Sequence, residues 1–428
     1  MGNVISGNSV ENPTFSLSFS TRFSTPKTLL LFGILGLIHS FPPPTTNTTK
    51  SLICCDRRKH MRIYISTEDL NAGISVISKA LPSRTAMPIL EGIYAEAQGN
   101  SLLLRCNDLS LQIETILPAT VEKEGSLVFP GRLFSDLARR QPDEQTLIET
   151  DKTTVTMKSG RARATMQAFD AAEYHSIPFS RQEFFVNIKK STLKNMIRQT
   201  IFATAQDETK PILTGVLLEI TDGLLSMVAL DGYRLALRRE SADGVTGEQK
   251  VVVPAKSLLE ISRILDDSND EIKVVFSKTH LLIDLEHTKI TTRLLEGEFI
   301  KYKQILPENH STCVRVNRQE LLDSIDRVSL IAREGKSNLI KFSFSGETLA
   351  ISANSEAGKS NEELTVSVIG SELEIAFNAK YVIDVLKALD DNEIFLEMNS
   401  SISPCVVKPV QGDRFYFLIL PVRLFSGL

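Results

Sequence analysis

Three stretches of the chain repeat one order of hydrophobic and polar positions. Each stretch begins with a run in which apolar residues recur every three or four positions behind a polar start, which predicts an amphipathic helix. Apolar and polar positions then alternate between short turns that contain Gly or Asp, which predicts a meander of antiparallel strands. The helical runs occupy residues 66–81, 189–205 and 317–333.

A second helical pattern follows each meander, directly after a strand, and further strands close each copy. Pro130, Pro254 and Asn378 mark equivalent points of the three copies, 124 residues apart in both intervals. The strand-helix segments are 126–140, 251–265 and 374–389.

A short phrase, Pro-Ile-Leu followed by one free residue and Gly, opens two of the meanders at Pro88 and Pro211, 123 residues apart. A unit above 100 residues is long enough to be a domain with its own core. Two helices per unit can cover only one face of the sheets. We therefore expect an α+β protein of three tandem copies of one domain. The expected segments are an N-terminal extension at 1–60 and domains at 61–183, 184–309 and 310–428.

The first 60 residues differ from the rest, since Glu11 and Asp56 are their only acids. Their apolar run at 29–38 is shorter than the roughly 20 residues that span a bilayer. It is compatible with a signal peptide, a transit peptide or a disordered tail. We favour translation from an upstream start codon, because Met61 opens a pattern typical of the beginning of a domain.

The charge of the chain is distributed unevenly. Residues 61–428 contain 42 Lys or Arg and 50 Asp or Glu, a net charge of −8. The six helical segments alone sum to +6, which leaves −14 for the remainder. A surface lined by these helices would attract phosphate, although solvated helix charges explain the count equally well. With no tryptophan and the aromatic residues mainly at strand positions, any nucleic-acid contact should be weak and made to the backbone.

No catalytic constellation is apparent. The six histidines have no paired spacing, and no phosphate-binding glycine loop occurs. The acids at 266–271 lack the glycine of a calcium loop, and Asp231 belongs to an Asp-Gly turn. A nuclease would need clustered acids for metal ions. We therefore expect no enzyme, no cofactor and no metal site.

The five cysteines have neither zinc-site spacing nor the density of a disulfide scaffold. Reduced cysteines are typical of a cytosolic protein. We expect a cytoplasmic, nucleoid-associated location, with import into an organelle if residues 1–60 are a transit peptide.

From Met61 to Leu424 the chain resembles the bacterial DNA polymerase III beta subunit family, the sliding clamps. The resemblance is carried by PSRTAMPILEGI, FATAQDETKPILTGVLLE, ALDGYRLA, VVVPAKSLLEI, FNAKYVIDVL and LPVRL, in this order. It implies a head-to-tail homodimeric ring of six similar domains, with antiparallel sheets outside and helix pairs lining the hole. It also implies a non-enzyme that encircles duplex DNA and acts as a processivity factor.

The resemblance implies several partners besides duplex DNA, which would be held topologically and without regard to sequence. These are the DNA polymerase III catalytic subunit, a clamp loader complex driven by ATP, other proteins with a clamp-binding motif, and a second copy of the chain. The competing hypothesis is an exported, triplicated β-rich binding protein whose signal is residues 1–60. Cleavage near residue 42 would favour that hypothesis.

Residues are carried over from the family position by position. The resemblance implies DNA contacts at Arg84, Arg132, Gln206 and Lys256. It implies a partner-peptide pocket between the second and third domains, lined by Leu213, Leu230, Gly232, Tyr233, Arg234, Leu235, Pro307, Leu418, Leu420, Pro421, Val422, Arg423 and Leu424. For the dimer interface it implies Ala164 and Met166 facing Leu330 and Ile331.

Two features depart from the family pattern. Relatives often carry an aromatic residue at the position of Ala164, so the dimer contact should be weaker or built differently. The chain also continues past Leu424 with four residues, 425–428. Our hypothesis is that this apolar tail folds into the peptide pocket and competes with partners, in which case its deletion would change peptide affinity.

Overall fold

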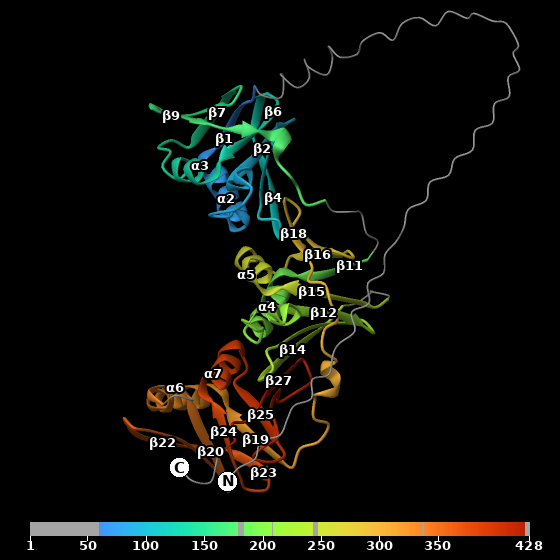
Figure 1. Ribbon diagram of the computed structural model, residues 1–428, viewed down its shortest axis with the longest axis vertical. Helices are drawn as coiled ribbons and strands as arrows, with labels where there is room; N and C mark the ends of the chain where they lie inside the picture. The colour runs from blue at the N-terminus through green and yellow to red at the C-terminus, as the bar shows by residue number, and fades with distance from the viewer. Residues whose placement is uncertain (1–59, 179–183, 208, 243–246, 336–337, 424–428) are drawn as a thin grey trace, which may run out of the picture. The chain divides into compact units, whose positions relative to one another are not determined.

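The computed structural model describes residues 60–178, 184–207, 209–242, 247–335 and 338–423 (Figure 1). These residues belong to one compact unit. Apart from His60, the N-terminal extension lies outside the described residues, as do Leu424 and the tail at 425–428. No helix within the described ranges is long and apolar enough to cross a membrane.

Each repeat has the predicted order of helix, meander, strand, helix and closing strands, and a strand that the sequence pattern did not predict precedes the first helix in each. The first comprises β1 Arg62–Ser66, α2 Thr67–Ile77, β2 Gly92–Gln98, β3 Ser101–Asn107, β4 Leu111–Pro118, β5 Thr120–Lys123, β6 Gly125–Pro130, α3 Gly131–Ala138, β7 Gln145–Asp151, β8 Thr154–Ser159, β9 Ala162–Gln167 and β10 Phe169–Asp170.

The second repeat comprises β11 Phe185–Lys189, α4 Lys190–Ile201, β12 Gly215–Thr221, β13 Leu224–Leu230, β14 Arg234–Ser241, β15 Gln249–Pro254, α5 Ala255–Ile264, β16 Glu271–Phe276, β17 His280–Asp284 and β18 Thr288–Arg293. The short helix η5 Tyr302–Gln304 follows it. The third repeat comprises β19 Thr312–Asn317, α6 Arg318–Glu334, β20 Leu339–Ser345, β21 Thr348–Ser355, β22 Gly358–Thr365, β23 Ser367–Gly370, β24 Leu373–Asn378, α7 Ala379–Ala388, β25 Glu393–Met398, β26 Cys405–Pro409 and β27 Phe415–Ile419.

The three equivalent positions that the sequence marked are helix N-caps. Pro130, Pro254 and Asn378 directly precede α3, α5 and α7. A proline at this point loses nothing, because the first amides of a helix have no partner within the helix. Only Asn378 also caps with its side chain, which accepts a hydrogen bond from the backbone N–H of Lys380 at 3.0 Å.

Helix α4 ends at Ile201, four residues before the predicted end at 205. The amides of Ala203 and Thr204 bond only three residues back, to Thr200 and Ile201. The amide of Ala205 instead donates to the carbonyl of Leu213 at 2.9 Å. The backbone therefore leaves the helix because its next donor is used by the following strand connection.

The repeated Pro-Ile-Leu phrase forms a 3-10 turn at Pro88–Glu91 and again at Pro211–Thr214. The glycines that follow begin β2 and β12. A Cβ atom on Gly92 would lie 2.9 Å from the carbonyl oxygen of Phe129, and one on Gly215 would lie 2.7 Å from that of Val253. Glycine recurs here because the neighbouring strand leaves no room for a side chain.

Within the described residues the strands form four antiparallel sheets, and two of these sheets cross from one repeat to the next. Strand β4 pairs with β18, with Ile113 opposite Ile290. Strand β14 pairs with β27, with Ala236 opposite Phe417. Each nine-stranded sheet is therefore built from two successive repeats, which the repeat pattern by itself did not predict.

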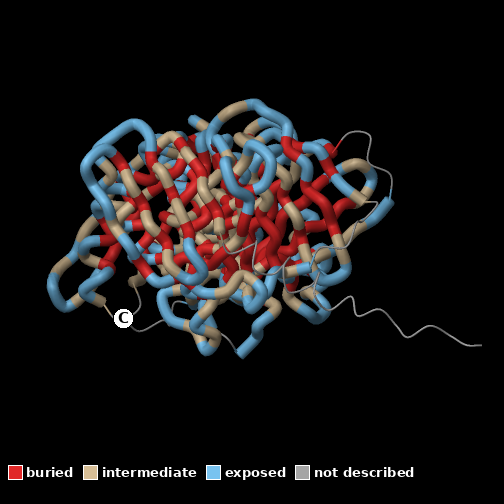
Figure 2. Tube along the Cα trace, turned by 90° about the horizontal axis from the view of Figure 1, so that it is seen from above, coloured by how far each residue is buried: buried red, intermediate tan, exposed pale blue. Residues whose placement is uncertain are grey.

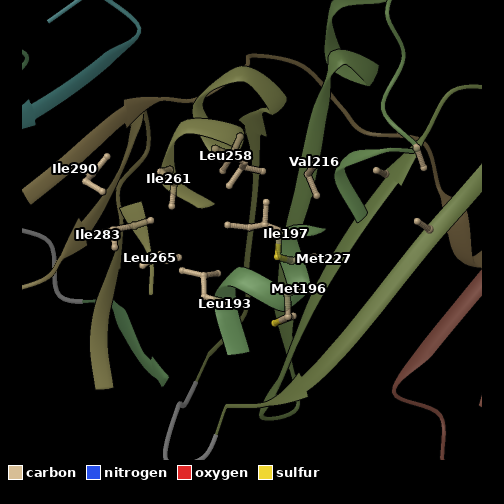
Figure 3. Packing of buried hydrophobic residues seen from close by; sticks show 14 of the residues in the cluster. Leu193, Met196, Ile197, Val216, Met227, Leu258, Ile261, Leu265, Ile283 and Ile290 are labelled. Atoms are coloured by element: carbon tan, nitrogen blue, oxygen red, sulfur yellow. The ribbon is translucent and has the colours of Figure 1, made fainter. Parts of the chain in front are cut away.

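The helices pack in pairs against the inner faces of the sheets, and buried positions follow the strands and these helix faces (Figure 2). Figure 3 shows the arrangement in the second repeat, where side chains from α4 and α5 meet those of the sheets. The side chains labelled there are Leu193, Met196, Ile197, Val216, Met227, Leu258, Ile261, Leu265, Ile283 and Ile290. Burial of this apolar surface is the main driving force for each repeat.

Candidate functional site

The four residues expected to contact DNA are all exposed. Arg132 and Lys256 are the second residues of α3 and α5, at equivalent points of two repeats. Arg84 and Gln206 lie in the segments that follow the first helices of these repeats. Across the described part of the chain, Arg84, Arg132 and Lys256 form no ion pair. Their positive charges are therefore free to attract phosphate groups.

Helix α4, the most basic segment, has most of its charge neutralised. Lys190 lies 3.3 Å from Asp266 and 3.0 Å from Asp270, and Lys194 lies 2.9 Å from Asp267. Arg198 pairs with Asp390 of the third repeat. The acids after α5 thus lie beside the bases of α4, so the helix charges counted from the sequence overstate the positive potential there.

The carboxylate partners of the α4 lysines can be replaced by other anions. The hydrogen bonds that Lys190 donates to Asp270 and Asp266 raise the pKa of Lys190, and the bond to Asp270 lowers the pKa of Asp270. The carboxylates are largely exposed to solvent. An exposed ion pair contributes only about 0–1 kcal/mol, so a phosphate group can compete for the lysines.

The predicted peptide-pocket leucines form an apolar cluster apart from the main core. Its members come from strands β12, β13, β14, β15 and β27, from the 3-10 turn before β12 and from η5, and the side chains of Leu295, Phe299, Leu306 and Leu420 pack against it. The cluster consists of Leu213, Leu217, Val228, Leu230, Leu235, Leu237, Val252, Tyr302 and Leu418. The four predicted leucines in it, Leu213, Leu230, Leu235 and Leu418, are 3–4% exposed and would form the floor of a pocket.

The remaining predicted pocket residues lie closer to solvent. Pro307, Leu420, Pro421 and Val422 are half-buried, whereas Gly232, Tyr233 and Arg423 are exposed. Tyr233, 61% exposed, stacks on Tyr381 of α7 with ring centres 6.1 Å apart. An apolar floor with an aromatic and polar rim is typical of a peptide-binding cleft.

The end of the chain joins the second and third repeats. The amide of Leu420 donates to the carbonyl of Tyr233 at 2.9 Å, and the amide of Val422 donates to that of Ala376 at 2.8 Å. Residues 420–422 therefore run between the two repeats, beside the exposed ring of Tyr233.

Asp231 holds the turn before β14 in place. Its carboxylate accepts hydrogen bonds from the amides of Tyr233 at 2.9 Å and Arg234 at 3.0 Å. Gly232 between them has φ of +95°, a conformation that favours glycine. The interpretation of Asp231 as a turn residue is confirmed.

Arg234 is buried, with 7% of its side chain exposed, and its donors are engaged. Nε donates to Asp231 at 3.0 Å, Nη1 to Asp384 of α7 at 2.6 Å, and Nη2 to the carbonyl of Phe202 at 2.6 Å. The guanidinium also lies 4.7 Å from the ring centre of Tyr381. Arg234 therefore connects the repeats beneath the pocket and does not present a free charge to a peptide.

A cavity of about 620 Å³ adjoins this apolar cluster, and sequence reasoning missed it. It shares Leu217, Val252 and Tyr302 with the cluster but none of the predicted pocket residues. In its wall lies Glu219, 3% exposed, which accepts a hydrogen bond from the Tyr302 hydroxyl at 2.5 Å. The sequence offered one indication of this cavity, namely that Glu219 is an acidic residue among the apolar positions of strand β12.

Glu219 is stabilised as a carboxylate. Lys250 and Lys303 lie 2.8 and 3.3 Å from its oxygens. Burial raises the pKa of Glu219, but the bonds from Lys250, Tyr302 and Lys303 outweigh it and leave this pKa below its usual value. These contacts fasten η5, and with it the connection to the third repeat, onto strand β12.

The residues expected at the dimer interface lie on or near terminal strands. Strand β9, which carries Ala164 and Met166, ends one sheet, and β22, which packs against α6, ends another. Leu330 on α6 is 61% exposed and Ile331 is half-buried. The side chain of Met166, in contrast, is 5% exposed and packs in the core of its own repeat.

The comparisons with known proteins cover all three repeats. Residues 61–178, 187–301 and 303–423 match the family models described as the N-terminal, central and C-terminal domains of the DNA polymerase III beta subunit. The beta sliding clamp of Bacillus subtilis (strain 168) is 35% identical over 378 residues, which is 85% of this chain and 100% of that protein. The beta sliding clamp of Staphylococcus aureus (strain N315) is 34% identical over 358 residues, 81% and 95% of the two chains.

Solved structures agree with these matches. The DNA polymerase sliding clamp of Bacillus subtilis superposes with a TM-score of 0.84 at 34% identity, over 86% of this chain and all of that one. A putative DNA polymerase III beta subunit from Eubacterium rectale gives a TM-score of 0.82 at 35% identity, over 85% and 100%. The α+β fold of three tandem clamp domains with antiparallel sheets is confirmed.

Proposed function

The chain belongs to the DNA polymerase III beta subunit family, and we propose that it acts as a DNA sliding clamp that encircles duplex DNA. The observation that supports this most directly is the threefold repeat at 61–423, in which the second residue of the second helix is an exposed cation without an ion pair among the described residues in each repeat: Arg132, Lys256 and Lys380. The similar proteins give no support to the alternative of an exported binding protein.

A ring holds DNA by topology, so its charges need only keep the duplex centred. Arg84, Arg132 and Lys256 would contact the phosphate backbone, and Gln206 would donate a neutral hydrogen bond. Such contacts carry no sequence information, which allows the ring to slide. Because Lys190 and Lys194 of α4 are paired with acids, they attract the DNA backbone less strongly than free lysines would. Weak binding suits a sliding ring, since tight binding to DNA would oppose its movement.

The ring requires a second copy of the chain, bound head to tail. Strand β9 is the edge strand of a sheet in the first repeat, and β22 is the edge strand of a sheet in the third. If β9 of one protomer paired with β22 of the next, the two sheets would join into one continuous sheet across the interface. Arg163 on β9 and Glu363 on β22 are exposed and of opposite charge. Leu330, Ile331 and Ala164 would supply the apolar contact, and Met166 would support it from within.

Partners would bind through short peptides in the cleft between the second and third repeats. We assign this role to the catalytic subunit of DNA polymerase III, to the clamp loader and to other proteins with a clamp-binding motif. The leucine floor would take an apolar anchor, and Tyr233 and Arg423 would contact its flanks. A polymerase that releases DNA would stay at high effective concentration and rebind, which makes synthesis processive.

As a clamp the protein would perform no catalysis, would need no cofactor for encircling DNA, and would act in the cytoplasm at the nucleoid. The domains are proposed to run over 61–183, 184–309 and 310–428. Residues 1–60 would take no part in the ring.

The test is to load the full chain onto nicked circular DNA with ATP and the clamp loader of a bacterial relative. Co-elution of protein and DNA is then scored before and after a restriction enzyme cuts the circle. Retention on the circle with loss from the linear form is expected for a closed ring that slides off ends. Equal retention on both forms would indicate ordinary backbone binding and would exclude the clamp function.

A further inference from the structure

Three side chains with different metal-binding atoms meet on the exposed face of the second nine-stranded sheet. His310 lies just before β19, Cys313 lies on β19, and Glu397 lies on β25. Their ligand atoms all lie within 4.8 Å of one another. We propose that these residues form a binding site for a borderline divalent cation, Zn²⁺. This inference is independent of the proposed clamp function.

The backbone brings the three residues together. Cys313 and Glu397 are directly opposite partners in the antiparallel pairing of β19 with β25. Directly opposite residues in such a pair have Cβ atoms about 4.5–5.5 Å apart, so both side chains project from the same face. A thiolate and a carboxylate oxygen can therefore reach one ion without any change of the backbone.

His310 is held in place from both sides. The amide of Ser311 donates to the carbonyl of Met398 at 3.1 Å, and the Ser311 hydroxyl donates to that of Asn399 at 2.9 Å. The side-chain amide of Asn399 donates to the carbonyl of Asn309 at 2.7 Å. The neighbours of His310 are thus fastened to the end of β25, and the imidazole Nδ1 lies 3.5 Å from Glu397.

The donor set selects the type of ion. A thiolate, an imidazole and a carboxylate together suit Zn²⁺, whereas Mg²⁺ and Ca²⁺ prefer oxygen ligands alone. Zn²⁺ bonds of about 2.0–2.3 Å require the three ligand atoms to approach more closely than they do here, by rotation of side chains. His310 is exposed and Cys313 is half-buried, so both can adjust. Water would complete the tetrahedral coordination.

The proton and charge balance of binding are simple. Zn²⁺ replaces the proton of the Cys313 thiol, which is released to solvent, and neutral His310 contributes a lone pair. The ammonium of Lys408 lies 2.5 Å from Oε2 of Glu397, the same oxygen that faces Nδ1 of His310, so the carboxylate would rotate to offer Oε1 to the metal while Lys408 keeps Oε2. It would act as an outer partner that orients the ligand.

The metal would attach the connection between the second and third repeats to β25. That connection also contains Pro307, whose carbonyl accepts a hydrogen bond from the Tyr416 hydroxyl at 3.3 Å. Lys408 lies 5.3 Å from the ring centre of Tyr416. The proposed site therefore lies near Tyr416, whose side chain packs against the apolar cluster of the predicted pocket leucines.

The first experiment titrates Zn²⁺ and Co²⁺ into the full chain carrying Cys54→Ser and Cys55→Ser, since that adjacent pair could itself bind metal. One equivalent is expected to bind in competition with a chromophoric chelator. Co²⁺ should give the absorption bands of tetrahedral coordination and a thiolate charge-transfer band. Cys313→Ser should abolish the charge-transfer band and weaken Zn²⁺ binding at least ~100-fold, because outer partners alone typically contribute ~10–100-fold.

His310→Ala and Glu397→Gln should also weaken binding, whereas the controls His287→Ala and Glu393→Gln should not. In a second measurement, Zn²⁺ should protect Cys313 from alkylation, scored by mass spectrometry, and a chelator should remove the protection. Binding only at millimolar Zn²⁺, octahedral Co²⁺ spectra, or unchanged affinity in Cys313→Ser would each overturn the proposal. Because the alkylation readout uses the unaltered site, it decides the question even if a variant fails to fold.

Discussion

The guanidinium of Arg234 lies 2.6 Å from the carboxylate of Asp384, and this ion pair joins β14 of the second repeat to α7 of the third. The two repeats also share a sheet through β14 and β27. The junction between the second and third repeats is therefore held by a sheet on one side and by a largely buried charge pair on the other.

Replacing Arg234 should destabilise this junction. Arg234→Ala leaves two acids without their partner, and removal of one member of a buried pair costs ~3–5 kcal/mol. Asp384 is 27% exposed, so we expect about 2–4 kcal/mol, measured by urea unfolding. The matched control is Arg239→Ala, whose partner Asp413 is 87% exposed and whose loss should cost under ~1 kcal/mol. If Arg234→Ala and Arg239→Ala lowered the free energy of unfolding equally, Arg234 would not be the main ionic contact of this junction.

Stability should fall in both acid and alkali because of Glu219 and Tyr302. The folded-state pKa of Glu219 lies below its ordinary value of 4.5, so its stabilisation is present above that pH and is lost as the pH falls through the folded pKa. Burial, and secondly the hydrogen bond to Glu219, raise the pKa of Tyr302 in the folded protein above its ordinary value of 10.0. The Tyr302 hydroxyl therefore ionises at a lower pH in the unfolded chain than in the folded one, and stability declines above pH 10.

The variants Glu219→Gln and Tyr302→Phe test this pH dependence. Tyr302→Phe should cost about 1.5–3 kcal/mol at neutral pH, because it removes a hydrogen bond to a charged group. It should also reduce the alkaline decline, and Glu219→Gln should reduce the acid decline. Both are read from unfolding free energies across the pH range. If the unfolding free energies of wild type and both variants changed with pH in parallel, Glu219 and Tyr302 would not be the source of the pH dependence.

Weak binding to linear duplex should depend on the three unpaired cations. Arg84→Ala, Arg132→Ala and Lys256→Ala should each lower the slope of log K against log salt by about 1, since each removes one phosphate contact. Fluorescence anisotropy at low salt measures this slope. Lys278→Ala, in the exposed turn between β16 and β17, serves as the control and should leave the slope unchanged.

Peptide affinity should depend on the rim of the apolar cleft. Tyr233→Ala and Leu420→Ala should each weaken binding of a fluorescent peptide from a DNA polymerase III catalytic subunit by about 10-fold, because they remove aromatic or apolar contact area. Ile402→Ala, 65% exposed in the turn between β25 and β26, should have no effect. Unchanged affinity in both rim variants would move the peptide site elsewhere.

Assembly should respond to a charge on α6. Leu330→Asp should weaken the dimer at least ~10-fold, since burying a leucine is worth about 1.5–3 kcal/mol and an unpaired carboxylate adds a desolvation cost. Analytical ultracentrifugation measures the dissociation constant. Leu259→Asp, at a 41% exposed position of α5, is the control. A dimer that survives Leu330→Asp would place the interface on another surface.

Local patterns were sufficient to predict the repeats and their helices. The 3.6-residue and two-residue periodicities depend only on neighbours along the chain, so α6 and α7 lie close to their predicted bounds, whereas α2 ends at Ile77, four residues before the predicted end, and continues as a 3-10 helix over Ser78–Ala80. The equivalence of Pro130, Pro254 and Asn378 was visible for the same reason, and the structure shows that they are helix N-caps. The end of α4 was missed because Leu213, a residue distant in sequence, takes the amide of Ala205.

The sequence alone determined that the chain contains three copies of an α+β domain, and its motifs indicated the family. Only the tertiary structure decided which charges are free, because the acids after α5 reach the lysines of α4 by folding across from a separate element. It also decided that Arg234 is buried, that Glu219 meets Tyr302, and that His310, Cys313 and Glu397 converge. Pairing between strands brings together residues far apart in the chain, and no spacing along the sequence records such pairing.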